Sequence, residues 1–300
     1  MINNFKLTVL LIPLFCCQTF AQTTDSLKGE IQQIILSKNA EVGVAISGNN
    51  GNDTLSLNGN QHFPLQSVFK FHIALAVLSQ IDKGKFNLNQ EIKIEKKDLL
   101  PDLYSPLRDE YPNGARLSLS KILEYTVSNS DNVGCEILLR LIGGPETVEK
   151  YCKENGIEDL SIKINEEQQQ ANWDLQFQNW TTPKEANKIL EIFYSNKNNL
   201  LSEESYNFIW KIMKETETGQ NRLKGQLPEG TIVAHKTGSS GTNKEGLTAA
   251  VNDIGIVFLP NGQYYFISVF VTKSTENAET NEKIIAEISK VTWEYFTREK

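Results

Sequence analysis

Residues 64–83 read PLQSVFKFHIALAVLSQIDK and predict a buried helix that begins with a serine and carries a lysine one turn later. Ser67 and Lys70 stand at positions i and i+3, which places them on the same face of a helix. A serine hydroxyl is a weak nucleophile until a base takes its proton, and the lysine amine is within reach to do so. Free N–H groups at the start of the helix also favour developing negative charge. The stretch therefore predicts a nucleophilic serine.

Taken alone, the Ser-x-x-Lys spacing is weak evidence. At average composition it occurs roughly once in a chain of this length. A second copy is present as Ser118-Leu119-Ser120-Lys121, which we interpret as the capped start of an ordinary helix. Considered by itself, Ser67 is as compatible with a helix cap as with a nucleophile.

Two rarer tripeptides complete the pattern. Ser130-Asp131-Asn132 is expected in a turn between helices, and Lys236-Thr237-Gly238 is expected on a strand beside the sheet edge. Each occurs by chance in only a few per cent of chains of about this length. Ser130 can pass a proton to a leaving nitrogen, and Asn132 can bind an amide. Lys236 and Thr237 can bind a carboxylate through a cation and a hydroxyl.

The rest of the chain predicts strands, then helices, then strands. A helix is expected at 25–38 with Asp25 as its cap, and a hairpin at 42–47 and 54–57. From about residue 68 to 224 most apolar positions recur at helical spacing, which predicts six helices at 68–83, 118–127, 133–142, 145–155, 183–194 and 202–213. Three β-rich stretches and a closing helix follow, at 231–237, 247–259, 264–272 and 277–296. The expected fold is therefore α/β of the α+β type, in which N- and C-terminal segments share one antiparallel sheet and a helical lobe is inserted between them.

The composition is that of an ordinary globular chain. Of 300 residues, 39% are hydrophobic and 22% are charged, which excludes disordered, collagen-like and coiled-coil chains. A formal charge of -7 argues against nucleic acid as a partner. The sequence holds no apolar run long enough to span a membrane.

Residues 1–21 predict a secretory signal peptide, with Lys6 as the positive start, an apolar stretch at 7–17 and a small-x-small cleavage site at 19–21. Its removal changes the formal charge from -7 to -8 and leaves 22–300 as one domain of two intertwined lobes. We expect a monomer in the periplasm. Cys135 and Cys152 remain in an oxidising compartment, where a disulfide and two buried thiols are both possible.

The three motifs together resemble the signature of class A serine β-lactamases and their penicillin-binding-protein relatives. The resemblance covers essentially all of the mature chain, and it implies that Ser67 is the nucleophile and Lys70 and Ser130 carry protons. It also implies that Tyr104 lies at the rim of the site. Arg222, fourteen residues before the lysine of the third motif, falls where one subgroup keeps an arginine that supports the substrate carboxylate.

In class A enzymes a glutamate on an Ω-shaped loop activates the water that releases the product. Thirteen residues before Asn179 this chain has Glu166, with Glu167 as the competing candidate. The usual proline after the glutamate and the asparagine four residues on are absent, and Glu167 and Gln170 take their places. The usual aspartate–arginine pair that clamps the loop is not evident either, because Asn179 replaces the acid.

Segments 178–181, 221–228 and 234–238 resemble the PER-type extended-spectrum subgroup. That resemblance implies a wide site for bulky cephalosporins, lined by Ser239 and Ser240, with Gln170 near the deacylating water. The implied activity is hydrolysis of the β-lactam ring of penicillins and cephalosporins, with Lys70 or Glu166 as the base of acylation and with antibiotic resistance as the consequence. The partner implied is a small-molecule β-lactam.

Three alternatives stay open. A penicillin-binding sensor and a D-Ala-D-Ala peptidase would form the same acyl-enzyme but would not need a loop glutamate, and an unrelated serine amidase such as a glutaminase usually lacks the Lys-Thr-Gly motif. No cofactor is implied. A zinc enzyme would need clustered histidines, whereas His62, His72 and His235 are scattered, and the last two are expected in the core.

Overall fold

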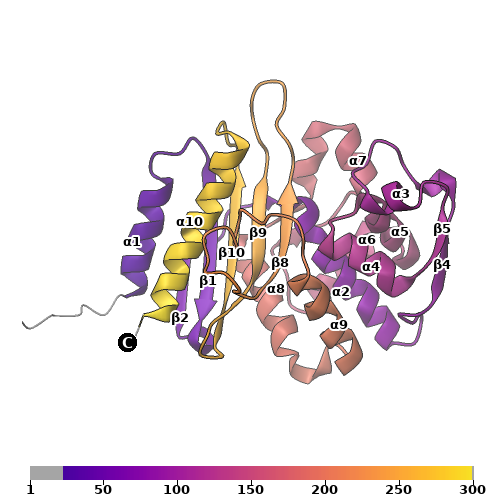
Figure 1. Ribbon diagram of the computed structural model, residues 1–300, viewed down its shortest axis with the longest axis horizontal. Coiled ribbons are helices and arrows are strands. Elements are labelled where there is room, and N and C mark those ends of the chain that lie inside the picture. The colour runs from indigo at the N-terminus through magenta and orange to yellow at the C-terminus, as the bar shows by residue number, and fades with distance from the viewer. Residues whose placement is uncertain (1–22, 299–300) are drawn as a thin grey trace, which may run out of the picture.

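The computed structural model describes residues 23–298, so the expected signal peptide at 1–21 lies outside the described residues. A five-stranded antiparallel sheet of order β2-β1-β10-β9-β8 forms the centre of the molecule (Figure 1). Its strands are β1 (Glu41–Gly48), β2 (Asp53–Leu57), β8 (Val233–Ser239), β9 (Val251–Phe258) and β10 (Tyr264–Thr272). Strands β1 and β10 pair directly, from Glu41 opposite Thr272 to Gly48 opposite Tyr265. The predicted sheet of N- and C-terminal segments is confirmed.

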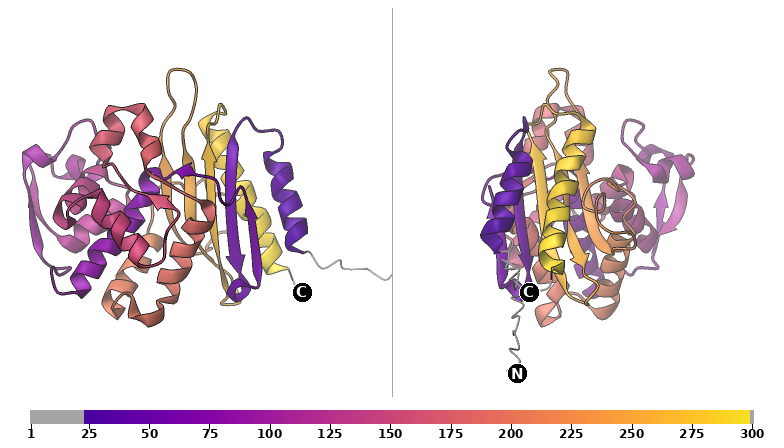
Figure 2. Two further views of the ribbon diagram at one scale, coloured as in Figure 1. Left: turned by 180° about the vertical axis from the view of Figure 1, so that it is seen from behind. Right: turned by 60° about the vertical axis from the view of Figure 1, so that its left-hand side comes forward.

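Helices cover both faces of this sheet. The first and last helices, α1 (Thr24–Ile35) and α10 (Ala278–Thr297), lie side by side on one face, and the helical lobe lies on the other (Figure 2). From that second side α8 (Pro183–Ser195) packs on β1 and β10. Because both faces are covered, β10 is buried from Tyr265 to Thr272.

The helical lobe is built around α2 (Phe69–Asp82), in which residues 69–79 are all buried. A helix surrounded on all sides needs apolar residues all round, which explains its sequence. The lobe also contains α3 (Pro106–Glu110), α4 (Leu119–Ser128), α5 (Asn132–Ile142), α6 (Pro145–Glu154), α7 (Glu166–Ala171) and α9 (Glu203–Lys214). The six helices predicted between residues 68 and 224 are confirmed.

Short elements escaped the sequence analysis, because two- to six-residue segments carry no readable periodicity. They form two small sheets, β3 (Phe63–Pro64) with β7 (Trp180–Thr181) and β6 (Leu160–Ser161), and β4 (Glu91–Ile94) with β5 (Ala115–Ser118). The 3-10 helices are η1 (Asn49–Gly51), η2 (Gln66–Val68), η3 (Lys96–Asp98), η4 (Trp173–Gln178) and η5 (Lys197–Asn199).

Two predicted helix caps have different outcomes. Helix α1 is capped by Thr23, whose hydroxyl accepts from the Ser26 N–H, and Asp25 lies inside the first turn, so the predicted Asp25 cap is wrong. Either residue type can cap a helix, and the structure places the threonine one position outside the first turn. Ser118 caps α4 as predicted, accepting from the Lys121 N–H at 3.2 Å.

Cys135 on α5 and Cys152 on α6 are both buried free thiols, so the disulfide left open by the sequence does not form. Burial raises the pKa of Cys152 to about 12 and also raises the pKa of Cys135, which keeps both thiols protonated and unreactive. Across residues 23–298 there is no helix with the length and apolar character needed to cross a membrane.

Candidate active site

Lys70 is the side chain on which the predicted site converges. Its Nζ donates to Ser67 Oγ at 2.7 Å and to Asn132 Oδ1 at 2.7 Å, and it forms a buried ion pair with Glu166. Ser67 lies in η2, which runs directly into α2, so the backbone holds the serine and lysine one turn apart. The Lys70 side chain is completely buried. A buried ammonium is tolerated because these three partners replace its water.

The structure separates the two candidate loop glutamates. Glu166 is the first residue of α7, is 6% exposed and contacts Lys70. Glu167 is exposed to solvent. The geometry therefore favours Glu166 as the carboxylate beside the nucleophile.

Glu136 on α5 is a site residue that the sequence analysis missed. Its carboxylate accepts from the backbone N–H of Glu166 at 2.7 Å, from that of Glu167 at 3.4 Å and from Asn165 Nδ2 at 2.9 Å. Burial raises the pKa of Glu136, and the two backbone hydrogen bonds oppose that rise. The sequence offered one signal for Glu136, because an acidic residue inside the apolar stretch 133–142 indicates a buried carboxylate with polar partners.

Asn179 replaces the expected acid–arginine clamp with backbone hydrogen bonds. Its side chain is fully buried, its Oδ1 accepts from the N–H groups of Lys163 at 2.8 Å and Ile164 at 3.1 Å, and its Nδ2 donates to the Ile164 carbonyl at 2.8 Å. A carboxamide can donate and accept at once, which a carboxylate cannot. One amide thus joins the two ends of the loop that carries Glu166.

A second contact joins this loop to the nucleophile. Gln66 Nε2 donates to Gln176 Oε1 at 2.6 Å, and both side chains are buried. Gln66 adopts a left-handed backbone conformation with φ of 46° directly before Ser67. This hydrogen bond therefore joins the loop that carries Glu166 to the turn that carries Ser67.

In the Ser-Asp-Asn turn, Ser130 and Asp131 hold the backbone in different ways. Ser130 has a φ of 60°, so the chain takes a left-handed conformation shortly after α4 ends at Ser128. Asp131 caps α5 through the Gly134 N–H at 2.7 Å and accepts from the Leu107 N–H at 2.7 Å. Burial raises the pKa of Asp131, and these hydrogen bonds oppose the rise. An Asp one residue before a helix is a recognisable cap signal, and the tripeptide is also compatible with a turn that caps this helix.

Lys236 on β8 faces this turn across the lobe boundary. Its Nζ donates to Ser130 Oγ at 2.9 Å and to the Thr237 carbonyl at 3.0 Å. The side chain is fully buried, and burial, followed by the nearby charge of Lys70, lowers the pKa of Lys236. The second and third motifs are thus in direct contact although they lie more than 100 residues apart.

Arg222 supports the end of β8 from behind. Its Nη1 donates to the carbonyls of Gly238 at 3.0 Å and Asn252 at 2.9 Å, and its Nη2 donates to Ser239 Oγ at 2.7 Å. Glu282 on α10 pairs with its Nε at 3.2 Å. With 8% of its surface exposed, Arg222 fixes the position of Ser239.

A cleft of about 290 Å³ opens over Ser67. It is lined by Gln66, Ser67, Asn132, Glu166, Gln169, Gln170, Trp173, Gln176, Ser239 and Ser240. Gln170 is exposed at this cleft. Tyr104 is 59% exposed, and its carbonyl accepts from the Asn132 N–H at 3.0 Å, which places it beside the cleft.

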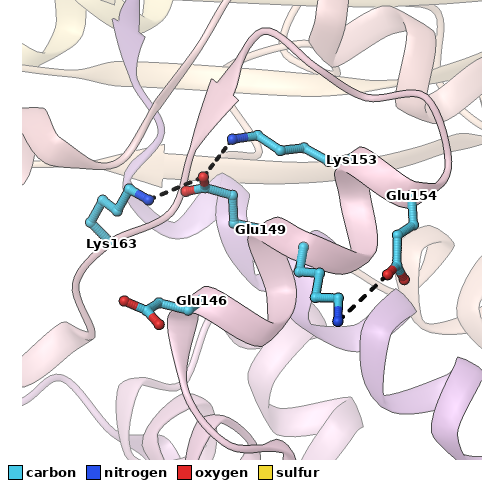
Figure 3. Close-up of a pocket in the computed structure, with 6 residues that line it drawn as sticks. Glu146, Glu149, Lys153, Glu154 and Lys163 are labelled. Atoms are coloured by element: carbon cyan, nitrogen blue, oxygen red, sulfur yellow. Dashed lines mark hydrogen bonds and ion pairs between the residues drawn. The ribbon is translucent and has the colours of Figure 1, made fainter.

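A second hollow, of about 610 Å³, lies along α6 (Figure 3). Glu149 pairs there with Lys153 at 2.6 Å and Lys163 at 3.1 Å (Figure 3). Lys150 pairs with Glu154 at 3.8 Å. These charges neutralise one another and leave no concentrated field for a ligand. The predicted site residues line the first cleft or support it, and none of them lines this hollow.

The predicted core histidines are confirmed. His72 is fully buried, and burial lowers its pKa to about 4. His235 is also fully buried, with Nδ1 at 2.9 Å from Asp253 Oδ1. Within the part of the chain that the structure describes, no group of three or more His, Cys, Asp or Glu side chains could hold a metal ion.

A serine beside a buried lysine and glutamate, at the edge of an antiparallel sheet, is the arrangement of a serine enzyme whose nucleophile is activated by neighbouring bases. A family model described as the β-lactamase enzyme family matches residues 26–296. The chain belongs to this family, and the class A resemblance read from its motifs is confirmed.

Individual relatives agree. The chain is 54% identical to β-lactamase VEB-1 of Pseudomonas aeruginosa, covering 97% of each chain. It is 42% identical to the extended-spectrum β-lactamase PER-1 of Pseudomonas aeruginosa, covering 96% of this chain and 92% of that protein. The crystal structure of TLA-3 extended-spectrum β-lactamase superposes with a TM-score of 0.89 at 49% identity, covering 92% of this chain and 100% of that one.

Proposed function

We propose that this β-lactamase opens the ring of penicillins and cephalosporins through an acyl-enzyme on Ser67, which water then hydrolyses with the help of Glu166. The single observation that carries the proposal is the position of Lys70, whose Nζ contacts both Ser67 Oγ and the Glu166 carboxylate. One ammonium thus joins the nucleophile of the first step to the base of the second.

In the acylation step, Ser67 Oγ attacks the lactam carbonyl carbon. Its proton passes to Lys70, after the ammonium has given one proton to Glu166, or through a water molecule to Glu166. The backbone N–H groups of Ser67 and Ser239 hold the oxyanion. Collapse of the tetrahedral intermediate breaks the C–N bond, and Ser130 gives its proton to the nitrogen. The proton that Ser67 released then replaces it on Ser130, so Lys70 and Glu166 return to their starting charges before deacylation. Since Ser130 Oγ accepts from Lys236, its own hydrogen is free to be donated.

Substrate binding in this proposal uses the side of the cleft formed by β8. Lys236 and Thr237 grip the carboxylate of the substrate, and Asn132 binds its amide. Arg222 acts through Ser239, to which it donates at 2.7 Å. Tyr104 stands at the rim.

In the deacylation step, Glu166 takes a proton from water, the resulting hydroxide attacks the ester carbonyl, and Ser67 Oγ leaves and is reprotonated. Gln170, exposed at the same cleft, is the proposed neighbour of this water. The loop that carries Glu166 is held by Asn179 and Glu136, which supports a fixed position for the base.

A broad substrate range and antibiotic resistance are part of the proposal. PER-1 and TLA-3 are extended-spectrum enzymes by name, and this chain resembles PER-1 in sequence and TLA-3 in sequence and fold. Ser239 and Ser240 line the cleft where β8 ends, and the loop that follows extends beyond the sheet (Figure 1). An extended loop at this edge leaves room for bulky cephalosporin side chains.

We also propose that residues 1–21 are removed on export and that the mature protein is a periplasmic monomer. The positive start, apolar stretch and cleavage site at 19–21 support export. N-terminal sequencing of protein recovered from the periplasm tests the cleavage, which should leave Gln22 first, and light scattering tests the monomer.

Intact-protein mass spectrometry after mixing with a cephalosporin tests the main proposal. We expect a transient mass gain of one acyl group that decays as the drug is consumed. A stable adduct at one equivalent would instead identify a penicillin-binding sensor or a D-Ala-D-Ala peptidase. If the drug is not consumed and the enzyme keeps its unmodified mass, both the acylation and the hydrolysis are rejected.

A further inference from the structure

A segment outside the three motifs, residues 216–219, lies against the threonine of the Lys-Thr-Gly motif. Thr218 Oγ1 is 2.6 Å from Thr237 Oγ1. Gly219 has φ of 66°, and a Cβ added there would lie 2.5 Å from Thr237 Cγ2. The segment therefore contacts both the hydroxyl and the methyl group of Thr237, and only a glycine fits at position 219.

Other contacts hold this segment in place independently of Thr237. The Glu217 N–H donates to the Ser128 carbonyl at 3.0 Å, and Glu217 Oε2 accepts from Asn129 Nδ2 at 2.7 Å. Thr216 Oγ1 donates to the His235 carbonyl at 2.6 Å. The segment thus bridges the end of α4, directly before Ser130, and the strand that carries Lys236.

Counting protons gives a direction to the Thr218–Thr237 hydrogen bond. Each hydroxyl has one hydrogen, whereas a substrate carboxylate only accepts. If Thr237 gives its hydrogen to Thr218, none is left for the carboxylate. Thr237 can hold a carboxylate through its hydroxyl only when Thr218 is the donor between them.

We propose that Thr218 is a positioning residue for substrate binding: it donates to Thr237 Oγ1 and so directs the Thr237 hydrogen toward the carboxylate of the β-lactam. This inference rests on the proposed function, in which Lys236 and Thr237 bind that carboxylate. Thr218 is partly buried beside Thr237, which is only 4% exposed, so the hydroxyl of Thr237 has few other ways to be oriented.

The first test compares Thr218→Val with Thr218→Ser on a penicillin. Valine keeps the shape of threonine and removes its donor, so we expect KM to rise about fivefold with kcat nearly unchanged, because the carboxylate contact exists in both ground and transition states. Serine keeps the donor and should restore KM. The matched control is Thr292→Val on α10, which removes a buried threonine hydroxyl that donates to the Ile288 carbonyl at 2.7 Å, and it should leave KM as it was.

Two further measurements distinguish a loss of orientation of the Thr237 hydroxyl from a general structural defect in the variant. On the methyl ester of the same penicillin, which lacks the anionic acceptor, the effect of Thr218→Val should fall to less than twofold. In the Thr237→Val background, Thr218→Val should cause no further loss, because the residue acts through Thr237.

An unchanged KM in Thr218→Val, an equal loss on acid and ester, or fully additive losses in the double variant would each overturn the inference. The failure of the proposed function is seen separately, in the unsubstituted protein. If that protein turns over no β-lactam, the proposed function is rejected and the inference is rejected with it. Normal turnover with any of the three contrary results rejects the role of Thr218 alone.

Discussion

The carboxylate of Glu136 accepts a hydrogen bond from the backbone N–H of Glu166 at 2.7 Å. Glu136, a buried acid on α5, thereby fixes the start of α7, where Glu166 contacts Lys70. Asn165 Nδ2 adds a second hydrogen bond to the same carboxylate at 2.9 Å. The position of the proposed deacylating base thus depends on a residue 30 positions earlier in the chain.

Replacing Glu136 is expected to slow deacylation more than acylation. Glu136→Ala leaves the Glu166 N–H without its acceptor, which costs about 1–3 kcal/mol and loosens the base. The acyl-enzyme should then accumulate during turnover, as measured by intact-protein mass spectrometry. Glu136→Gln keeps one acceptor oxygen and should give an intermediate result. Acylation and deacylation slowed to the same extent would contradict this role.

The two loop glutamates give a matched pair. Glu166→Gln is expected to trap the acyl-enzyme and lower kcat by about 10³-fold, because a positioned general base contributes on that scale. Glu167→Gln should keep turnover, since Glu167 is exposed. Rapid-quench mass spectrometry with one cephalosporin measures both. If Glu167→Gln traps the adduct and Glu166→Gln does not, the assignment must be reversed.

The two Ser-x-x-Lys copies offer a similar comparison. Ser67→Ala is expected to abolish labelling by a β-lactam, because the attacking oxygen is gone. Ser118→Ala should keep labelling but lower the free energy of unfolding by about 1 kcal/mol, since Ser118 caps α4. Labelling and urea unfolding are measured on both variants. A covalent adduct in Ser67→Ala would place the nucleophile elsewhere.

Asn179→Ala removes three hydrogen bonds to buried backbone groups. We expect the free energy of unfolding to fall by about 2–4 kcal/mol, because the freed N–H and C=O groups stay unpaired. Asn179→Asp keeps an acceptor for Lys163 and Ile164 but loses the donor to the Ile164 carbonyl, and it should cost less. Urea unfolding of both variants measures the difference. A loss below 0.5 kcal/mol in Asn179→Ala, on the order of a surface substitution, would show that the loop does not depend on this amide.

His72 makes stability depend on pH in a defined window. Burial lowers its pKa from 6.5 to about 4, so between these values the unfolded chain binds a proton that the folded protein does not. Stability therefore rises with pH across this window and is fully present above pH 6.5, and His72 accounts for up to about 3 kcal/mol.

His72→Leu removes this titration and should flatten the pH dependence. Urea unfolding at intervals from pH 4 to 7 measures it, and the slope for the variant should be smaller than that for the unsubstituted protein by up to one proton. Equal slopes for the two proteins would mean that His72 does not titrate in this window.

Local patterns were enough to predict most elements and the identity of the reacting groups. The apolar stretch of α2, the helical spacing in α4, the β-rich composition of the terminal strands, and the three motifs all depend on neighbours within a few residues. The predicted sheet and the six predicted helices of the lobe are present. These local patterns predicted some details wrongly, such as the cap of α1, which is Thr23 and not Asp25.

The sequence by itself determined the family, the fold class and the side chains that meet at Lys70, because short motifs and periodicity record the chemistry and the burial of each segment. Only the tertiary structure decided which residues hold those side chains in place. Glu136 under Glu166, Asn179 at the ends of its loop, and Thr218 beside Thr237 contact partners from 15 to 30 residues away. Such contacts depend on how the chain returns to itself, and no periodicity within a segment encodes that distance.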